Sequence, residues 1–235
     1  MGLTLLAVAF DAEDPRSVAE FWGALLAREL RPDGDGWVLP GSATQVGLQF
    51  VPVRPDTNPG GRRLHLHVTS ETLAAQGETV EHALRLGAQH RDVGQRPEEG
   101  HIVLADPGGN EFCVIAAGNA YLSGTGRLGE VTCDGTQAVG HFWSSALGWP
   151  LVWDQDEETA IQSPAGGTKI AWGGPPMAAK RGRNPQHFVL EVGAAERERE
   201  VARLTGLGAR HTSPPSDGPA ELTDPDGNEF VVRAR

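Results

Sequence analysis

Apolar residues recur along the chain with two spacings, and each spacing predicts one kind of element. From Pro15 to Leu26 they fall every three or four residues, which places them on one face of a helix. Asp14 and Pro15 suit the start of that helix, because the carboxylate can cap free N–H groups and proline tolerates the first turn. Short apolar runs such as 46–51 and 102–104 lie between Gly and Pro residues, which predicts strands.

The unit of one strand, one helix and several strands recurs four times. The residue pairs that end the amphipathic stretches stand 60, 61 and 60 residues apart, at Leu26-Ala27, Leu86-Gly87, Leu147-Gly148 and Leu207-Gly208. The helices are therefore expected at 15–26, 74–86, 137–147 and 195–207. Such a regular internal repeat predicts a fold built from four similar units.

A longer repeat joins these units in pairs. Phe21-Trp22 returns as Phe142-Trp143, and the motif Asp-Pro-x-Gly-Asn-Glu-Phe occupies both 106–112 and 224–230. In this motif Asp bonds local N–H groups while Pro, Gly and Asn favour turn geometry, which predicts a tight hairpin. We expect a duplication, with one domain at 1–118, a Ser/Gly-rich linker at 119–127 and a second domain at 128–235.

The Phe-Trp helix, the strand at 187–192 and the closing hairpin motif resemble the vicinal-oxygen-chelate superfamily, in its tandem glyoxalase-like and bleomycin-resistance-like form. The resemblance implies an α+β fold of two tandem domains, in each of which two βαβββ modules form one cupped mixed sheet, with helices outside and a pocket on the concave face. It also implies either a monomer whose halves pack as an internal pseudo-dimer or a homodimer. Enzymes and drug-sequestering proteins both use this fold, so the fold leaves the function open.

Charge and composition limit the classes of molecule that the protein is expected to bind. The net charge is −11, with 31 acidic and 20 basic residues, which disfavours nucleic acid and anionic membrane surfaces. No apolar run approaches the roughly 20 residues of a membrane span, and the first residues lack the basic flank and cleavage site of a signal peptide. Two cysteines without disulfide spacing suit a reducing compartment. We expect a cytoplasmic protein whose partner is a small molecule.

The resemblance also implies a divalent metal held by His, Gln and Glu side chains on particular strands. Spacing from the shared motifs places these positions at Ala7, Gln49, Arg63 and Cys113 in the first half, and at Glu130, Ala171, His187 and Val231 in the second. No pairing of the halves then assembles three ligands. We therefore predict no metal and no other cofactor, with a divalent metal at a divergent site as the alternative.

Two histidines of the first half are further candidates for the site. His65 and His67 are two residues apart on one expected strand, so their side chains share a face. They either chelate together with a third ligand, such as Gln49 or Glu111, or hydrogen-bond within a polar pocket lining. Cys113 is expected to be an inert buried thiol, because Arg63 is the one cation that the sequence could bring near it.

The second half offers three candidates for acid–base chemistry, namely His187, Glu191 and Glu229. A carboxylate that faces an apolar cup has a raised pKa and can act as a general base. The alternative is structural, because Glu229, like Glu111 in the first half, could bond its own hairpin, and His187 could be satisfied within the core.

Three tryptophans on expected strands, Trp37, Trp153 and Trp172, could form an aromatic wall for a planar ligand, or simply pack the core. We predict that the protein binds a small aromatic or hydrophobic molecule in a cup-shaped pocket, as a resistance-type sequestration protein does. The expected ligand-binding residues are these tryptophans with Gln49, Arg63, His65, His67, Glu111 and Glu130. The alternative is a lyase, isomerase or dioxygenase-type enzyme, with a divergent metal site or with metal-free acid–base catalysis.

Overall fold

The computed structural model of the chain describes residues 2–54, 60–177, 179–214, 216 and 218–235. It contains four βαβββ units, as the repeat predicted. The first comprises β1 (Thr4–Ala12), α1 (Pro15–Leu26), β2 (Arg31–Asp33), β3 (Gly36–Leu39) and β4 (Gly47–Pro52). The second comprises β5 (Leu64–Val68), α2 (Leu73–Arg85), β6 (Gln89–His90), the short 3-10 helix η1 (Pro97–Glu99), β7 (His101–Ala105) and β8 (Glu111–Ile115).

The second half of the chain repeats this arrangement. The third unit comprises β9 (Leu128–Cys133), α3 (Gln137–Leu147), β10 (Leu151–Gln155), β11 (Glu158–Gln162) and β12 (Lys169–Trp172). The fourth comprises β13 (Gln186–Val192), the 3-10 helix η2 (Ala194–Glu196), α4 (Arg197–Gly206), β14 (Arg210–His211), β15 (Ala220–Thr223) and β16 (Glu229–Ala234). The expected helix at 195–207 was therefore too long at its start, because its first residues belong to η2.

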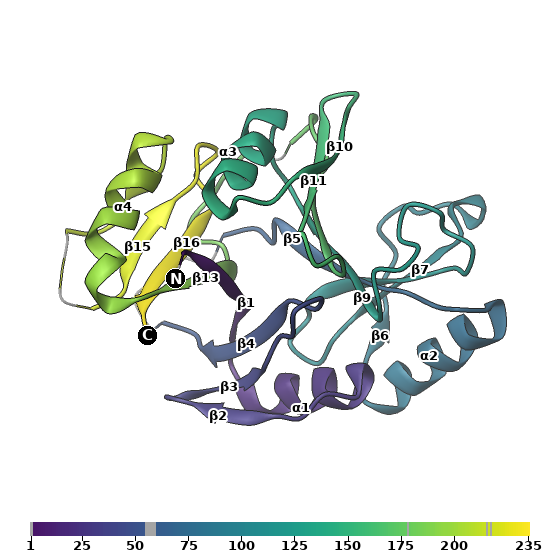
Figure 1. Cartoon of the computed structure of the whole chain (residues 1–235). Helices are drawn as coiled ribbons and strands as arrows, with labels where there is room; N and C mark the ends of the chain where they lie inside the picture. Colours follow the sequence, from purple (N-terminus) through teal and green to yellow (C-terminus); the bar gives the residue numbers. More distant parts are fainter. Residues whose placement is uncertain (1, 55–59, 178, 215, 217) are drawn as a thin grey trace.

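The four units form two eight-stranded sheets, and each sheet takes one unit from each half of the chain. The first sheet has the order β14-β15-β16-β13-β1-β4-β3-β2 and joins the first and fourth units. The second has the order β10-β11-β12-β9-β5-β8-β7-β6 and joins the second and third. At the centre of each sheet the leading strands of its two units pair antiparallel, β1 with β13 and β5 with β9. The predicted α+β architecture of mixed sheets with helices outside is confirmed (Figure 1). The expectation that the two modules of one domain share a sheet was wrong, because the modules that share a sheet come from different halves of the chain.

Helix α1 shows how the sequence sets an element. The Asp14 carboxylate accepts a hydrogen bond from the Ser17 N–H at 3.1 Å, and Pro15 occupies the first turn. The helix ends at Ala27, which adopts the left-handed conformation with φ of 53°. The apolar stripe predicted from the spacing, which includes Phe21 and Trp22, is buried against the sheets.

The Asp-Pro-x-Gly-Asn motifs form the predicted hairpins and also fasten them to helices. Asp106 is buried and accepts hydrogen bonds from the Asn110 N–H at 2.8 Å and from the Trp22 indole N–H at 2.9 Å. The second copy repeats both contacts, with Asp224 accepting from the Trp143 indole at 3.2 Å. Burial raises the pKa of Asp106 and outweighs these hydrogen bonds, which favour its ionised form. Each motif therefore joins a core helix to the last strand of a neighbouring unit.

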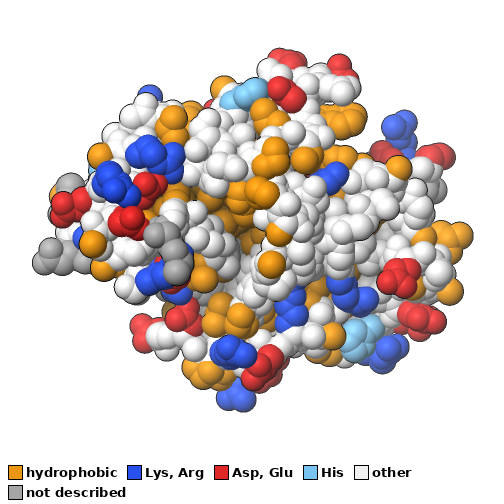
Figure 2. Space-filling view, viewed as in Figure 1, with side chains coloured by type: hydrophobic (Ala, Val, Ile, Leu, Met, Phe, Trp, Pro, Cys, Tyr) orange, Lys and Arg blue, Asp and Glu red, His pale blue; other side chains and the backbone are white. Residues whose placement is uncertain are grey.

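Alternation along the strands gives each sheet two different faces. In β5 the side chains of Leu64, Leu66 and Val68 pack against the helices in the main core, whereas His65 and His67 point to the opposite side. We call that opposite side the open face of each sheet. On the face of the molecule shown in Figure 2, acidic and basic side chains lie interspersed. None of the helices in the described part of the chain is long and apolar enough to cross a membrane.

Candidate functional site

Three neighbouring strands bring one polar side chain each to the centre of the second open face. The register pairs His67 of β5 with Glu130 of β9 on one side and with Cys113 of β8 on the other. His65 stands two residues earlier on the same face, opposite Thr132. We call His65, His67, Cys113 and Glu130 the histidine cluster.

The four side chains of the cluster are in close contact. The Nδ1 atom of His67 lies 2.8 Å from Glu130 Oε2, and its Nε2 atom lies 3.0 Å from His65 Nε2. The metal-binding atoms of His65, His67 and Cys113 all lie within 4.8 Å of one another. The Thr132 hydroxyl donates to Glu130 Oε2 at 3.0 Å and fixes that carboxylate. The predicted shared face of the two histidines is confirmed, although Gln49 and Glu111 are not their partners.

The contacts give the two histidines different charge states, one neutral and one positive. Burial lowers the pKa of His65, and the charge of the neighbouring His67 lowers it further, to about 4, which favours a neutral His65. Burial also opposes a charged His67, but its hydrogen bonds to Cys113 and Glu130 outweigh burial and raise its pKa to about 9. The same pairing lowers the pKa of Glu130 in spite of the burial of that group. A protonated His67 can therefore donate from Nδ1 to Glu130 and from its other nitrogen to His65 or to Cys113, which compete for that N–H.

This donor set fits a divalent transition metal. Two imidazole nitrogens and one thiolate are ligands that zinc prefers, and three protein ligands leave a coordination position open. Glu130 contacts the other ring nitrogen of His67, which is the contact that orients a metal-binding histidine. Among the residues that the structure describes, His65, His67 and Cys113 are the group whose ligand atoms converge in this way.

The linker between the two halves packs on this open face. Its Leu122 is buried against Cys113, and its Tyr121 hydrogen-bonds Glu130. The ammonium of Lys169 lies 3.8 Å from the centre of the Tyr121 ring and donates to the Tyr121 carbonyl at 2.5 Å. Trp153 meets the Tyr121 ring edge to face, with 6.1 Å between ring centres, and 37% of its surface is exposed. Tyr121, Lys169 and Trp153 therefore border the histidine cluster.

The first sheet lacks this chemistry at equivalent positions. Its register sets Ala7 where the second sheet has Glu130, and Val189 and Val231 where the second sheet has His67 and Cys113. Only the equivalent of His65 is again a histidine, His187. The open face of the first sheet nevertheless borders a cavity of about 450 Å³, lined in part by Asp11, Gln49, His187, Arg183 and Arg233.

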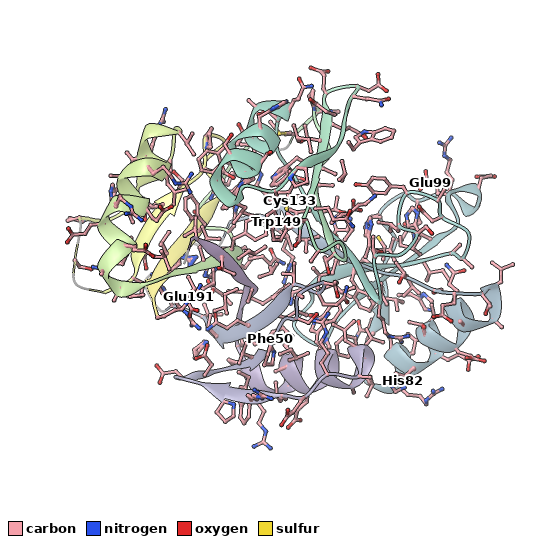
Figure 3. The ribbon with its side chains drawn as sticks, viewed as in Figure 1. Phe50, His82, Glu99, Cys133, Trp149 and Glu191 are labelled. Carbon is pink, nitrogen blue, oxygen red and sulfur yellow. The ribbon has the colours of Figure 1, made fainter. Side chains whose placement is uncertain are left out.

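The proposed catalytic residues of the second half lie on this first sheet and are separated from one another. His187 is buried, and its Nδ1 atom is 3.9 Å from Asp11 and makes no hydrogen bond to any of the residues that the structure describes. Burial lowers the pKa of His187 to about 3, so the ring is neutral. Glu191, labelled in Figure 3, is held by Arg233 and Arg235.

The remaining carboxylate and amide candidates are bound by nearby side chains. Glu229 pairs with Lys180 at 2.8 Å. Gln49 donates to Asp33 at 2.7 Å on the first sheet. Glu111 borders the second open face but pairs with Arg91 at 3.5 Å. Each of these groups thus has a structural partner.

Arg63 occupies a different place from the one that spacing assigned. The spacing put it at the metal-ligand position of the fifth strand, but it precedes β5, and the register puts His67, four residues later, opposite Cys113. Arg63 is buried, and its guanidinium donates to Asn228 Oδ1 at 2.9 Å. Asn228 lies just before β16 of the first sheet. The role of Arg63 is thus a contact between the two sheets. The same register places Val189, rather than His187, at the corresponding position of the first sheet.

The tryptophans divide between the two faces. Trp172 is fully buried in the core, and Trp37 packs against that core on the helix side, with the Arg16 guanidinium 5.4 Å from its ring centre. Trp153 pairs with Ala160 on the open face of the second sheet. The expected aromatic wall is therefore reduced to Trp153 together with Tyr121, which the sequence did not single out.

Comparisons with known proteins agree with this architecture. Over nearly its whole length the chain superposes on glyoxalase I from Zea mays with a TM-score of 0.63 and 14% identity, covering 99% of this chain and 92% of that one. A proposed dioxygenase from Bacillus subtilis gives a TM-score of 0.63 at 13% identity, covering 100% and 85% of the two chains. These identities establish a shared fold only. No curated protein matches the chain.

The family assignment comes from the sequence itself. The family model described as the glyoxalase-like domain matches the chain twice, at residues 7–115 and 130–233. Each match spans two of the βαβββ units, and together they cover most of the chain. The chain belongs to the glyoxalase-like domain family and carries two copies of that domain.

Proposed function

We propose that the open face of the second sheet is the active site of a metal-dependent enzyme that acts on a small molecule, and that the histidine cluster holds one divalent ion. The observation that supports this proposal is that one ligand atom each from His65, His67 and Cys113 lie within 4.8 Å of one another. Two nitrogens and one sulfur favour zinc over magnesium or calcium, which prefer oxygen ligands.

The residues of the cluster have separable tasks. His65, His67 and Cys113 would bind the ion, and Glu130 would hold the ring of His67 in the orientation that binding needs. Metal binding requires a neutral His67, so it releases the proton that the metal-free protein keeps there. When bound, such an ion supplies Lewis acidity to an oxygen atom of the ligand. Leu122 and Tyr121 pack beside the cluster and limit the access of water to it.

The contact between His67 and Glu130 supports a second candidate function. At 2.8 Å the pair forms a hydrogen-bonded dyad in which Glu130 stabilises the protonated ring. Without a metal, His67 would donate its proton to a bound molecule. In this candidate the site catalyses acid–base chemistry, and Cys113 accepts a hydrogen bond in place of binding a metal.

Metal content of the purified full chain separates the two candidates. The protein is produced in medium with added zinc, nickel, cobalt and manganese, passed over a desalting column and measured by elemental analysis. We expect about one equivalent of zinc or cobalt per chain. A folded wild-type protein that carries no metal, and takes up none from added zinc, would refute the metal-dependent proposal and favour the acid–base candidate.

The duplicated chain provides matched control variants. His65→Ala should lose the metal, whereas His187→Ala, at the equivalent position of the first sheet, should keep it. In the cobalt-loaded protein the thiolate-to-cobalt absorption should disappear in Cys113→Ser and persist in Cys133→Ser, because Cys133 is buried in the main core on the helix side of β9. Metal retained equally in all four variants would place it outside the histidine cluster.

A further inference from the structure

An ammonium group stands on the open face of the second sheet, one strand away from the histidine cluster. The parallel register of β9 and β12 pairs Lys169 with Glu130, so their side chains share that face. The residue equivalent to Lys169 in the first sheet is Gly47, which pairs in the same way with Ala7. Lysine is rare in this chain, since Lys169 and Lys180 are its only two lysines. The second sheet therefore carries an ammonium beside its donor atoms, at a position where the first sheet has a glycine.

Lys169 is fixed in place by an aromatic group rather than by a carboxylate. Its Nζ atom lies 3.8 Å from the centre of the Tyr121 ring and donates to the Tyr121 carbonyl. Within the described part of the chain no carboxylate forms an ion pair with this ammonium, and Glu130 acts on it at longer range. Partial burial lowers the pKa of Lys169, and the charge of Glu130 offsets this effect only in part. A bound anion would supply the missing partner.

Tyr121 connects this cation to the cluster and to an exposed ring. Its side chain hydrogen-bonds Glu130, which contacts His67, and its ring meets the indole of Trp153. The ammonium, the buried donors and the partly exposed indole therefore lie along one row of the open face. Such a row can take a molecule that has a charged end and a planar apolar body.

The charges of the row favour a molecule with a single negative charge. A divalent ion on a Cys113 thiolate, together with Glu130 and Lys169, leaves the site with one positive charge in excess. Glu158, another carboxylate that acts on Tyr121, is exposed to solvent and screened. A carboxylate balances that excess, whereas a dianionic phosphate exceeds it.

We infer that Lys169 is the anion-binding residue of this site and that the substrate is a small organic carboxylate with a planar apolar group. The inference rests on the proposed function, because it assigns the substrate class of the same open face. Lys169 would bind one oxygen of the substrate carboxylate and direct the other oxygen toward the histidine cluster. Trp153 would contact the planar group of the substrate.

Isothermal titration of the full chain with benzoate and with benzamide tests this assignment, because the two probes share a ring and differ in charge. We expect benzoate to bind the zinc-loaded protein at least tenfold more tightly than benzamide does. Lys169→Met, which keeps the stem and removes the charge, should remove that difference. Lys180→Met is the matched control and should bind benzoate as the wild type does, since Lys180 pairs with Glu229 on the first sheet.

Further measurements separate the possible outcomes. Lys169→Arg should restore part of the preference for benzoate, and thermal melting of each variant shows whether it folds. Equal binding of benzoate to the wild type and to Lys169→Met, or no benzoate binding at all, would overturn the inference. Inorganic phosphate that binds more tightly than benzoate would overturn the carboxylate class. If the chain takes up no metal but prefers benzoate through Lys169, the metal proposal fails and the assignment of Lys169 stands.

Discussion

The pair of His67 and Glu130 should make the stability of the metal-free protein fall at alkaline pH. The folded pKa of His67 is raised from 6.5 to about 9, so its contribution is fully present below pH 6.5 and is lost as pH rises through 9. A shift of this size corresponds to about 3 kcal/mol at 1.36 kcal/mol per unit. The two side chains are only 17% and 6% exposed, so screening by solvent removes little of it.

The assay is urea unfolding, followed by circular dichroism in the presence of a chelator, at intervals from pH 6.5 to 9.5. We expect the free energy of unfolding of the wild type to fall across this interval by about 3 kcal/mol. Glu130→Gln should be less stable at pH 6.5 and should show a smaller loss than the wild type, because the neutral amide no longer favours the charged ring and only the contact with Cys113 still does. Glu111→Gln, which alters a half-exposed carboxylate of the same face, should keep the wild-type slope. A wild-type stability that is flat across the interval, or an unchanged slope in Glu130→Gln, would refute the assigned pair.

Three further predictions concern packing, the hairpin anchors and metal binding. Gly140→Ala should destabilise the protein by about 1–3 kcal/mol, because the new methyl group would meet a buried threonine of β11. Gly77→Ala in α2 has open space around the new methyl group and should stabilise the protein by about 0.5–1 kcal/mol. Urea unfolding measures both changes. Trp22→Phe should cost about 1–3 kcal/mol in the same unfolding experiment, because it removes an indole donor from the buried Asp106 carboxylate. Zinc at a hundredfold excess over its dissociation constant should stabilise the wild type by about 2.7 kcal/mol in thermal melts, and Cys113→Ser should lose most of this effect.

Local chemistry explains why the elements could be predicted from the sequence. The start of α1 depends on Asp14 and Pro15, which act on their own neighbours, and the hairpin motif at 106–112 closes on itself. The duplication is visible in the sequence because both copies keep the same turn and the same helix motif. Such signals need no knowledge of distant contacts, so the number, order and kind of the units follow from them.

The site depended on a register that no local signal sets. Spacing from the motifs placed Arg63 at the ligand position of the fifth strand, but the loop before β5 leaves the offset of that strand undetermined. Any slide by an even number of residues keeps the same face, so the alternation of His65 and His67 could show their side but not their partners. Cys113 was judged inert for the same reason, because its contact with His67 joins residues 46 positions apart.

The division of units between the sheets makes each open face an interface between the two halves of the chain. The second face takes His65, His67 and Cys113 from the first half, and Glu130 and Lys169 from the second. Neither half alone contains the complete set of side chains. A molecule that bridges these residues would therefore hold the halves together as well as occupy the site. Occupancy of the site and the association of the two halves are then coupled. If the linker were cut, the two pieces should associate more tightly in the presence of metal and ligand than in their absence.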